Sequence, residues 1–151
     1  MHVATFSKRA FSVIVSECSR YENEETGGIL LGYYNNYNWE ILETIFPGPN
    51  AIHRSAEFLY DNEYVDYEIN SISLIYEIPL KILGIWHTHV TDSPFSLMDE
   101  KTNLQFAKLN PFGTLSLLVN KSSNKFELFF TNITGEYKKI NFNIASNDII
   151  N

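Results

Sequence analysis

A short apolar run that ends in two histidines, residues 82–89, constrains this chain more than any other stretch. Its sequence is Ile-Leu-Gly-Ile-Trp-His-Thr-His, which has the length and composition of a buried strand and is short for a helix. His87 and His89 are two positions apart, so in a strand their side chains leave the same face. Two imidazoles that converge on one point suit a divalent metal ion. We therefore expect a buried strand that presents a pair of metal ligands at its end.

A carboxylate follows this strand, because Asp99 lies ten residues after His89. Two histidines and one carboxylate, with a fourth position left open, are typical ligands of a catalytic zinc ion. Asp99 also has a structural explanation, since Ser96-x-x-Asp99 ahead of an apolar helix is typical of a capping box. Both interpretations can hold, because an Asp in a first helical turn can point back at the strand end. Asp92 is a competing ligand, which we rank below Asp99 because it lies in a Pro-containing loop that it can cap itself.

Composition favours one globular domain over residues 1–151, because 44% of the residues are hydrophobic and 15% are aromatic. Charged residues make up 19% of the chain, which argues against disorder. The net charge is −7 and the eleven basic residues are scattered, so nucleic acid is a poor partner. The N-terminus does not resemble a signal peptide, and no apolar stretch approaches the roughly 18 residues that span a bilayer, so we expect no membrane partner. Cys18 is the only cysteine and cannot form an internal disulfide, which fits the cytoplasm.

Hydrophobic periodicity and turn residues predict an α+β domain with a mostly antiparallel, curved sheet flanked by about three helices. Strands are expected at 29–34, 37–46, 56–60, 82–89, 115–120, 125–131 and 137–142, the last three as an antiparallel meander. Helices are expected at 7–22, 61–77 and 97–109, the first capped by Ser7 and the second by Asp61 or Asn62. The apolar faces of the first two helices are Phe11, Ile14, Val15 and Cys18, and Val65, Ile69, Ile72 and Tyr76. Cys18 is therefore expected to be a buried small side chain rather than a reactive thiol.

Three segments, taken in order, resemble the JAMM (MPN+, JAB/MPN) family of zinc metalloproteases. They are Glu-Thr-Gly-Gly-Ile-Leu-Leu-Gly at 25–32, His-Thr-His at 87–89 and Ser-x-x-Asp at 96–99. Residues 48–58 also resemble the family's segment between the first hairpin and the second helix. The resemblance covers about residues 3–131 and implies an MPN/JAB-like fold with cytidine-deaminase-like layering. The chain departs from the family pattern in its loop, because six residues instead of seven separate His89 from Ser96, and Val90 stands where Pro is usual.

The resemblance implies a role for five residues. His87, His89 and Asp99 would hold Zn²⁺ and leave one position for water. Glu25 would take the proton of that water and later pass it to the leaving amine. Ser96 would hydrogen-bond the oxyanion of the tetrahedral intermediate. In well-known relatives the substrate is a peptide or isopeptide bond after the tail of ubiquitin or a ubiquitin-like protein, and an extended tail would bind along a sheet edge.

A short chain that begins at its own Met is most similar to stand-alone bacterial members of the family. Those members trim ubiquitin-like or sulfur-carrier tails, or reverse protein conjugation in antiphage operons. The resemblance therefore implies a cytoplasmic zinc isopeptidase or peptidase whose partner is a ubiquitin-like protein or another conjugated tail. A homodimer is a further expectation, because aromatic residues gather around the first hairpin, although alternate ones can simply fill the core. These residues are Tyr33, Tyr34, Tyr37 and Trp39.

Other functions stay open at this stage. A catalytically inactive scaffold of the same fold is the main alternative, because many relatives have lost their ligands and the loop here is short. Two histidines at a strand end are also often ordinary surface residues. A cupin-type site would need another histidine downstream, whereas His2 and His53 lie upstream, and His53 is expected on an exposed or substrate-facing loop. Cysteine-protease chemistry is disfavoured because Cys18 lies in the middle of a helix with no histidine near it in sequence.

Overall fold

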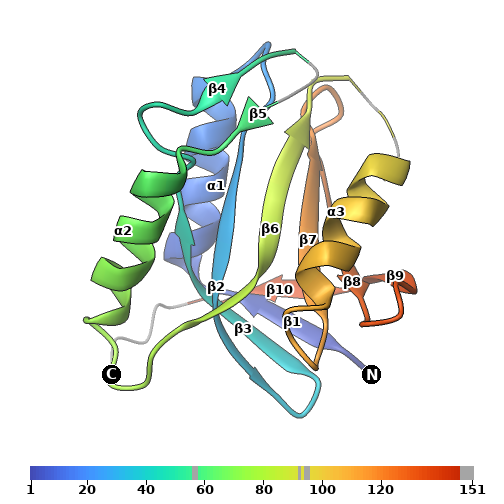
Figure 1. The fold of residues 1–151 in the computed structure, drawn as a ribbon. Helices are drawn as coiled ribbons and strands as arrows, with labels where there is room; N and C mark the ends of the chain where they lie inside the picture. The colour runs from blue at the N-terminus through green and yellow to red at the C-terminus, as the bar shows by residue number, and fades with distance from the viewer. Residues whose placement is uncertain (56–57, 92, 94–95, 147–151) are drawn as a thin grey trace.

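The computed structural model describes residues 1–55, 58–91, 93 and 96–146, in which one large sheet separates helix α1 from helices α2 and α3 (Figure 1). The elements are β1 (Val3–Phe6), α1 (Lys8–Arg20), β2 (Gly27–Asn35), β3 (Asn38–Ile45), β4 (Ile52–His53), β5 (Phe58–Leu59), α2 (Asn62–Ser73), β6 (Lys81–His89), α3 (Leu97–Ala107), β7 (Thr114–Asn120), β8 (Lys125–Thr131), β9 (Tyr137–Ile140) and β10 (Phe142–Ile144). Within the described residues, the main sheet has eight strands in the order β10-β1-β3-β2-β6-β7-β8-β9, and β4 pairs with β5 separately. Of the seven pairings along the described main sheet, β10–β1, β1–β3 and β6–β7 are parallel and the other four are antiparallel. The predicted α+β class with a mostly antiparallel sheet is confirmed.

The sheet is strongly curved, because its two edges are joined by a single residue. β9 lies at one edge and β10 at the other, yet only Asn141 separates them in the chain. Consecutive Cα atoms are about 3.8 Å apart, so the two edges come close together. β10 pairs in parallel with β1, and the ring of Phe142 lies 5.3 Å from that of Phe6. The predicted antiparallel meander is confirmed for β7, β8 and β9. Its last strand ends at Ile140 instead of residue 142, because the chain bends at Asn141 and Phe142 pairs with β1, a strand that is not among the predicted ones.

Helix α1 begins where the sequence predicts, but it is rotated relative to the predicted apolar face. Ser7 is the N-cap, and its Oγ accepts a hydrogen bond of 3.0 Å from the backbone N–H of Ala10. The buried residues of the helix are Ala10, Ile14 and Glu17, with Phe11 and Cys18 packed at the margin of the core. Val15 is predicted on the apolar face but is 43% exposed, because it lies on the side of the helix that faces away from the core. Burial raises the pKa of the Cys18 thiol to about 11, in keeping with the predicted structural role.

Helix α2 covers the opposite face of the sheet. Asp61, one of the two predicted caps, accepts a hydrogen bond of 3.2 Å through Oδ1 from the backbone N–H of Tyr64. The predicted apolar face is confirmed for Val65, Ile69 and Ile72, of which the first is buried and the other two pack against the same cluster. The helix ends at Ser73 instead of near residue 77, so Tyr76 packs against this cluster from beyond the helix. None of the helices in the described part of the chain is long and apolar enough to span a membrane.

Candidate metal centre

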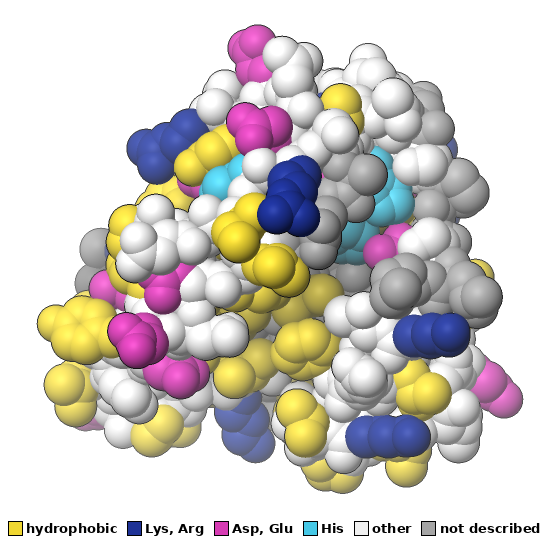
Figure 2. Space-filling view, turned by 45° about the horizontal axis from the view of Figure 1, so that its top comes forward, with side chains coloured by type: hydrophobic (Ala, Val, Ile, Leu, Met, Phe, Trp, Pro, Cys, Tyr) yellow, Lys and Arg dark blue, Asp and Glu magenta, His cyan; other side chains and the backbone are white. Residues whose placement is uncertain are grey.

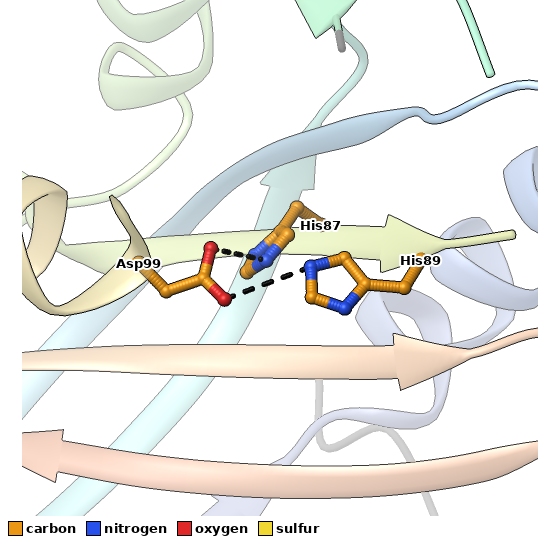
Figure 3. A group of neighbouring side chains, drawn as sticks. All are labelled: His87, His89 and Asp99. Atoms are coloured by element: carbon orange, nitrogen blue, oxygen red, sulfur yellow. Dashed lines mark ion pairs between the residues drawn. The ribbon is translucent and has the colours of Figure 1, made fainter. Parts of the chain in front are cut away.

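Strand β6 lies between β2 and β7 in the middle of the main sheet, and a bulge in it decides which way its histidines point. In a regular strand Leu83 and Trp86 would face opposite sides, yet both lie in the core cluster beneath α1. The register with β2 shifts beside Gly84, where an added Cβ would lie 1.8 Å from the carbonyl oxygen of Leu115 on β7. After this bulge, His87 and His89 point to the face that carries α3 (Figure 3). The bulge thus allows one strand to bury its apolar side chains in the core and to present two predicted metal ligands at its end.

Helix α3 brings Asp99 to the same place. Ser96 is its N-cap: Ser96 Oγ accepts from Asp99 N at 3.1 Å, and Asp99 Oδ2 accepts from Ser96 N at 2.8 Å. Asp99 Oδ1 lies 3.0 Å from His87 Nε2, and its Oδ2 lies 3.6 Å from His89 Nε2 (Figure 3). One ligand atom from each of the three residues lies within 4.8 Å of the other two. The structure therefore brings the three predicted ligands together; the capping box of Asp99 is confirmed, and its role as a metal ligand stays a prediction.

These three residues have the donor atoms that a divalent metal ion needs, and the ring nitrogens of His87 are buried without a hydrogen-bond partner among the described residues. His87 is 8% exposed, and neither of its ring nitrogens has a hydrogen-bond partner among the described residues, although Nε2 lies close to Asp99. A buried nitrogen without a partner costs free energy, and a cation between the imidazoles and the carboxylate would satisfy it. Two nitrogens and one oxygen form a donor set that zinc accepts.

The electrostatic environment keeps both kinds of ligand in the form that binds a metal. Burial lowers the pKa of His89, and His87 lowers it further, which favours the neutral imidazole with a free lone pair. Burial alone would raise the pKa of the Asp99 carboxyl, but the neighbouring imidazole of His87 and the hydrogen bond from Ser96 hold it at about 2. Asp99 is therefore ionised and negatively charged at neutral pH. In Figure 2 histidine side chains (cyan) and acidic side chains (magenta) lie together on this face, next to hydrophobic side chains (yellow).

Glu25, the predicted general base, lies two residues before β2, the strand antiparallel to β6. Gly27 pairs with His87, and Thr26 accepts a hydrogen bond of 2.9 Å from the backbone N–H of Thr88. Continuing this register places Glu25 beside His89. The backbone of Glu25 is held from the other side as well, because its N–H donates to Arg54 O at 2.5 Å and its carbonyl accepts from His53 Nδ1 at 3.0 Å. The catalytic roles of Glu25 and Ser96 remain predictions.

Two other residues and the first hairpin complete the comparison with the sequence. His53 lies on the short strand β4 rather than on a loop; it is half-buried, and its ring stacks 3.6 Å from that of Tyr21. Asp92, the competing ligand, lies outside the described residues. Around the first hairpin, Trp39 is buried whereas Tyr37 is 55% exposed, so the aromatic residues divide between core and surface and self-association stays a prediction.

Two residues near the ligands were not found by sequence reasoning. Ser93 Oγ lies 2.8 Å from His89 Nδ1, and Asn120 Oδ1 accepts a hydrogen bond of 3.2 Å from the backbone N–H of Ser93. Asn120 is the last residue of β7 and pairs with His89 in the parallel register of β6 and β7. The only signal for Asn120 was its position at the end of a predicted strand, and Ser93 belongs to no motif.

Comparisons with known proteins agree with this geometry. The family model described as prokaryotic homologs of the JAB domain matches residues 7–130, a range that contains Glu25 and all three ligands. The probable metalloprotease y4qB of Sinorhizobium fredii is 30% identical over 77 residues, which are 50% of this chain and 47% of that protein, so the match spans about half of this relative. The solution structure of protein DSY2949 from Desulfitobacterium hafniense has a TM-score of 0.71 over 94% of this chain and 92% of that one, at 13% identity, a likeness of fold alone. Since the family model covers most of the chain, this protein belongs to the prokaryotic JAB family.

Proposed function

We propose that this protein is a zinc-dependent peptidase or isopeptidase that hydrolyses the bond after the C-terminal tail of a ubiquitin-like protein or a similar conjugate. The observation that carries the proposal is the convergence of His87, His89 and Asp99, whose ligand atoms lie within 4.8 Å of one another. Membership of the JAB family and the partial match to a probable metalloprotease support hydrolase chemistry at this cluster. A cytoplasmic role in reversing bacterial protein conjugation is the biological setting that we propose for it.

In the proposed mechanism His87, His89 and Asp99 would hold a zinc ion, which would supply Lewis acidity to water and to the scissile carbonyl. Glu25 acts as general base and takes a proton from the attacking water. As the carbon–nitrogen bond breaks, the same carboxyl group returns this proton to the leaving amine. Two hydrogen bonds hold the backbone of Glu25 in place for these two transfers: its N–H donates to the Arg54 carbonyl, and its own carbonyl accepts from the ring of His53.

Ser96 has the hydrogen needed for its proposed role at the oxyanion. Its Oγ accepts from the backbone N–H of Asp99, and this bond does not use the hydrogen of the hydroxyl group. That hydrogen can be donated to the oxygen that becomes negatively charged as the tetrahedral intermediate forms. Because Ser96 is fixed by the capping box next to a metal ligand, its position depends on the first turn of α3.

The substrate class follows from the need for an extended, accessible peptide. A flexible tail can add as a strand to the edge of a sheet through backbone hydrogen bonds, with little dependence on its side chains. The separate β4–β5 sheet lies close to Glu25, because Arg54, the residue after β4, accepts the backbone hydrogen bond of Glu25. We propose that such a tail pairs with an edge of this small sheet. The proposed partner is therefore a protein that ends in, or is conjugated through, an unstructured tail.

The alternative function is a catalytically inactive scaffold of the same fold. The observation that favours it is the loop between β6 and α3, where six residues separate His89 from Ser96 and the family pattern has one more. A scaffold would keep the fold and the family match but would have no need of a general base at Glu25.

Cleavage of a linear fusion between a ubiquitin-like protein and a reporter distinguishes the two functions. We expect the zinc-loaded wild type to release the reporter, and Glu25→Gln to be about 10²–10⁴-fold slower, which is the usual contribution of a general base. Glu25→Gln should still bind zinc, because Glu25 is not among the three ligands. The peptidase function would be contradicted by equal rates in the two proteins. Absence of cleavage across peptide-linked and isopeptide-linked fusions would favour the scaffold.

A further inference from the structure

The loop that follows β6 contains a hydroxyl group in contact with a predicted metal ligand. Ser93 Oγ lies 2.8 Å from His89 Nδ1 and 3.3 Å from the carbonyl oxygen of Thr91. We propose that Ser93 is a positioning residue that fixes His89 in the tautomer whose Nε2 lone pair faces the metal site. This inference rests on the proposed zinc site, to which it adds a residue outside the family's motif positions.

The assignment follows from counting hydrogens. A backbone carbonyl only accepts hydrogen bonds, so the contact with Thr91 O uses the single hydrogen of the Ser93 hydroxyl. Both contacts of Ser93 Oγ are hydrogen bonds only in the arrangement in which Oγ accepts from His89, and this arrangement places a hydrogen on Nδ1 of the imidazole. A neutral imidazole carries one ring hydrogen, so Nε2 is left with its lone pair. Nε2 is the atom that lies 3.6 Å from Asp99 Oδ2 in the cluster (Figure 3).

Ser93 is itself held by the buried end of the neighbouring strand. Its backbone N–H donates to Asn120 Oδ1 at 3.2 Å, and Asn120 is 5% exposed. The next residue, Lys121, donates its backbone N–H to the carbonyl of His89 at 3.0 Å. The end of β7 therefore fixes both the backbone of His89 and the serine that contacts its ring. A metal-bound histidine is usually oriented by a hydrogen bond from its second ring nitrogen, and these contacts supply one.

The inferred role also explains how His89 can be held in place although the loop that follows it is short. The loop lacks one residue of the family pattern and has Val90 in place of Pro. The backbone after His89 is therefore not restricted by a proline ring, which would fix its φ angle. Ser93 and Asn120 supply hydrogen bonds at that position instead. The tautomer of His89 thus depends on a residue that this chain places in its own loop.

Zinc affinity of the full chain, measured by competition with a chelator, tests the inference without a substrate. Ser93→Ala removes the hydroxyl and should weaken zinc binding about 10–100-fold, the usual effect of losing such a partner. Ser93→Thr keeps a hydroxyl at the same position and should restore most of the affinity. Ser12→Ala, on the exposed side of α1, is the matched control and should bind zinc as the wild type does.

The ring hydrogen itself can be observed in the metal-free protein by long-range proton–nitrogen correlation spectra of the histidine side chains. The His89 signals are identified by their loss in His89→Gln. We expect hydrogen on Nδ1 in the wild type and in Ser93→Thr, and a shift toward hydrogen on Nε2 in Ser93→Ala. The inference is overturned if Ser93→Ala keeps the wild-type tautomer, whatever happens to its zinc affinity. If the wild type binds no zinc, the proposed function fails, while the spectra still decide the role of Ser93.

Discussion

At the scale of single residues, two largely buried carboxylates near the end of β6 have opposite environments. Asp99 receives hydrogen bonds from Ser96 and lies beside His87, which together hold its pKa at about 2 against the effect of burial. Glu17 on α1 is 2% exposed, and its Oε1 accepts from Thr26 Oγ1 at 3.2 Å. Its Oε2 lies 4.0 Å from Arg20 Nη1, an ion pair too long for a hydrogen bond. Burial raises the pKa of Glu17, only partly opposed by Thr26 and Arg20. The environment of Asp99 thus favours the ionised form that its predicted role as a ligand needs, whereas ionised Glu17 lowers the stability of the fold.

Replacing this buried carboxylate is expected to stabilise the fold. A raised folded-state pKa means that the folded protein binds the proton of Glu17 more tightly than the unfolded chain does. Above the unfolded pKa the ionised group therefore destabilises the fold, and this cost disappears as pH falls below it. Glu17→Gln replaces the buried charge by a neutral amide, which costs less to bury, and should raise the free energy of unfolding at pH 7 by about 1–3 kcal/mol. Urea denaturation at pH 7 and at pH 4 would show a gain at the higher pH that shrinks at the lower.

The exposed Glu77 provides the matched control. Glu77→Gln should leave stability within about 0.5 kcal/mol at both pH values, as is usual for a surface substitution. A Glu17→Gln protein that is less stable than the wild type at pH 7 would show that the carboxylate has a stabilising partner, and this account of Glu17 would be wrong.

At the scale of elements, helix α3 links stability to the metal site through its first turn. Ser96 caps the helix, and the same capping box orients the carboxylate of Asp99 toward the histidines. Ser96→Ala should lower the free energy of unfolding of the metal-free protein by about 0.5–2 kcal/mol, because the N-cap is lost. Ser96→Asn keeps a side-chain acceptor at the N-cap and should remain near the wild type.

Urea denaturation of the three metal-free proteins measures this effect separately from catalysis. Ser12→Ala is again a suitable control, since Ser12 lies exposed within α1. Equal stabilities of Ser96→Ala and the wild type would mean that the first turn of α3 does not depend on its cap.

Local elements were the part of this fold that the sequence could predict. The cap at Ser7, the cap at Asp61 and the apolar face of α2 depend on neighbouring residues, and each is confirmed. The pairing of β1 with β10 could not be predicted, because it joins opposite ends of the chain and leaves no periodic pattern in four- and three-residue strands. The rotation of α1 was missed because Glu17 lies on its buried face, where an apolar side chain is expected.

The candidate site shows the same division. His87, His89 and Asp99 were predictable because a strand end and a first helical turn are local features with fixed side-chain directions. Ser93 and Asn120 were not, since their contacts depend on the parallel pairing of β6 with β7 and on the path of a loop. The partner of His53 was missed for a similar reason, because β4 reaches Glu25 only in the folded chain.

At the scale of the whole molecule, the curved sheet encloses an aromatic cluster that contains His2. Trp39 donates from Nε1 to His2 Nδ1 at 2.9 Å, and the ring of Phe130 on β8 stacks 3.9 Å from the imidazole. The cluster therefore joins the N-terminal end of β1 to β3 and β8. Burial, with Lys138 and the N-terminal amine, lowers the pKa of His2.

The stability of the fold should consequently fall in mild acid. With a lowered folded-state pKa, the unfolded chain binds the proton of His2 more tightly, so stability is lost as pH falls below the ordinary histidine value of about 6.5. His2→Phe keeps an aromatic ring but does not titrate, so its urea midpoint should change less between pH 7.5 and pH 5.5 than that of the wild type. An equal change in the two proteins would show that other groups cause the acid sensitivity.

The account as a whole depends on one question, which is whether the three converging ligands bind zinc. The direct measurement is elemental analysis of the chain purified without added metal and again after reconstitution, beside the double variant His87→Ala/His89→Ala. We predict about one zinc per wild-type chain and none in the double variant, because a single carboxylate is too few ligands for a zinc site. Wild-type protein that holds no zinc even after reconstitution would contradict the metal centre and leave the inactive scaffold as the function of this fold.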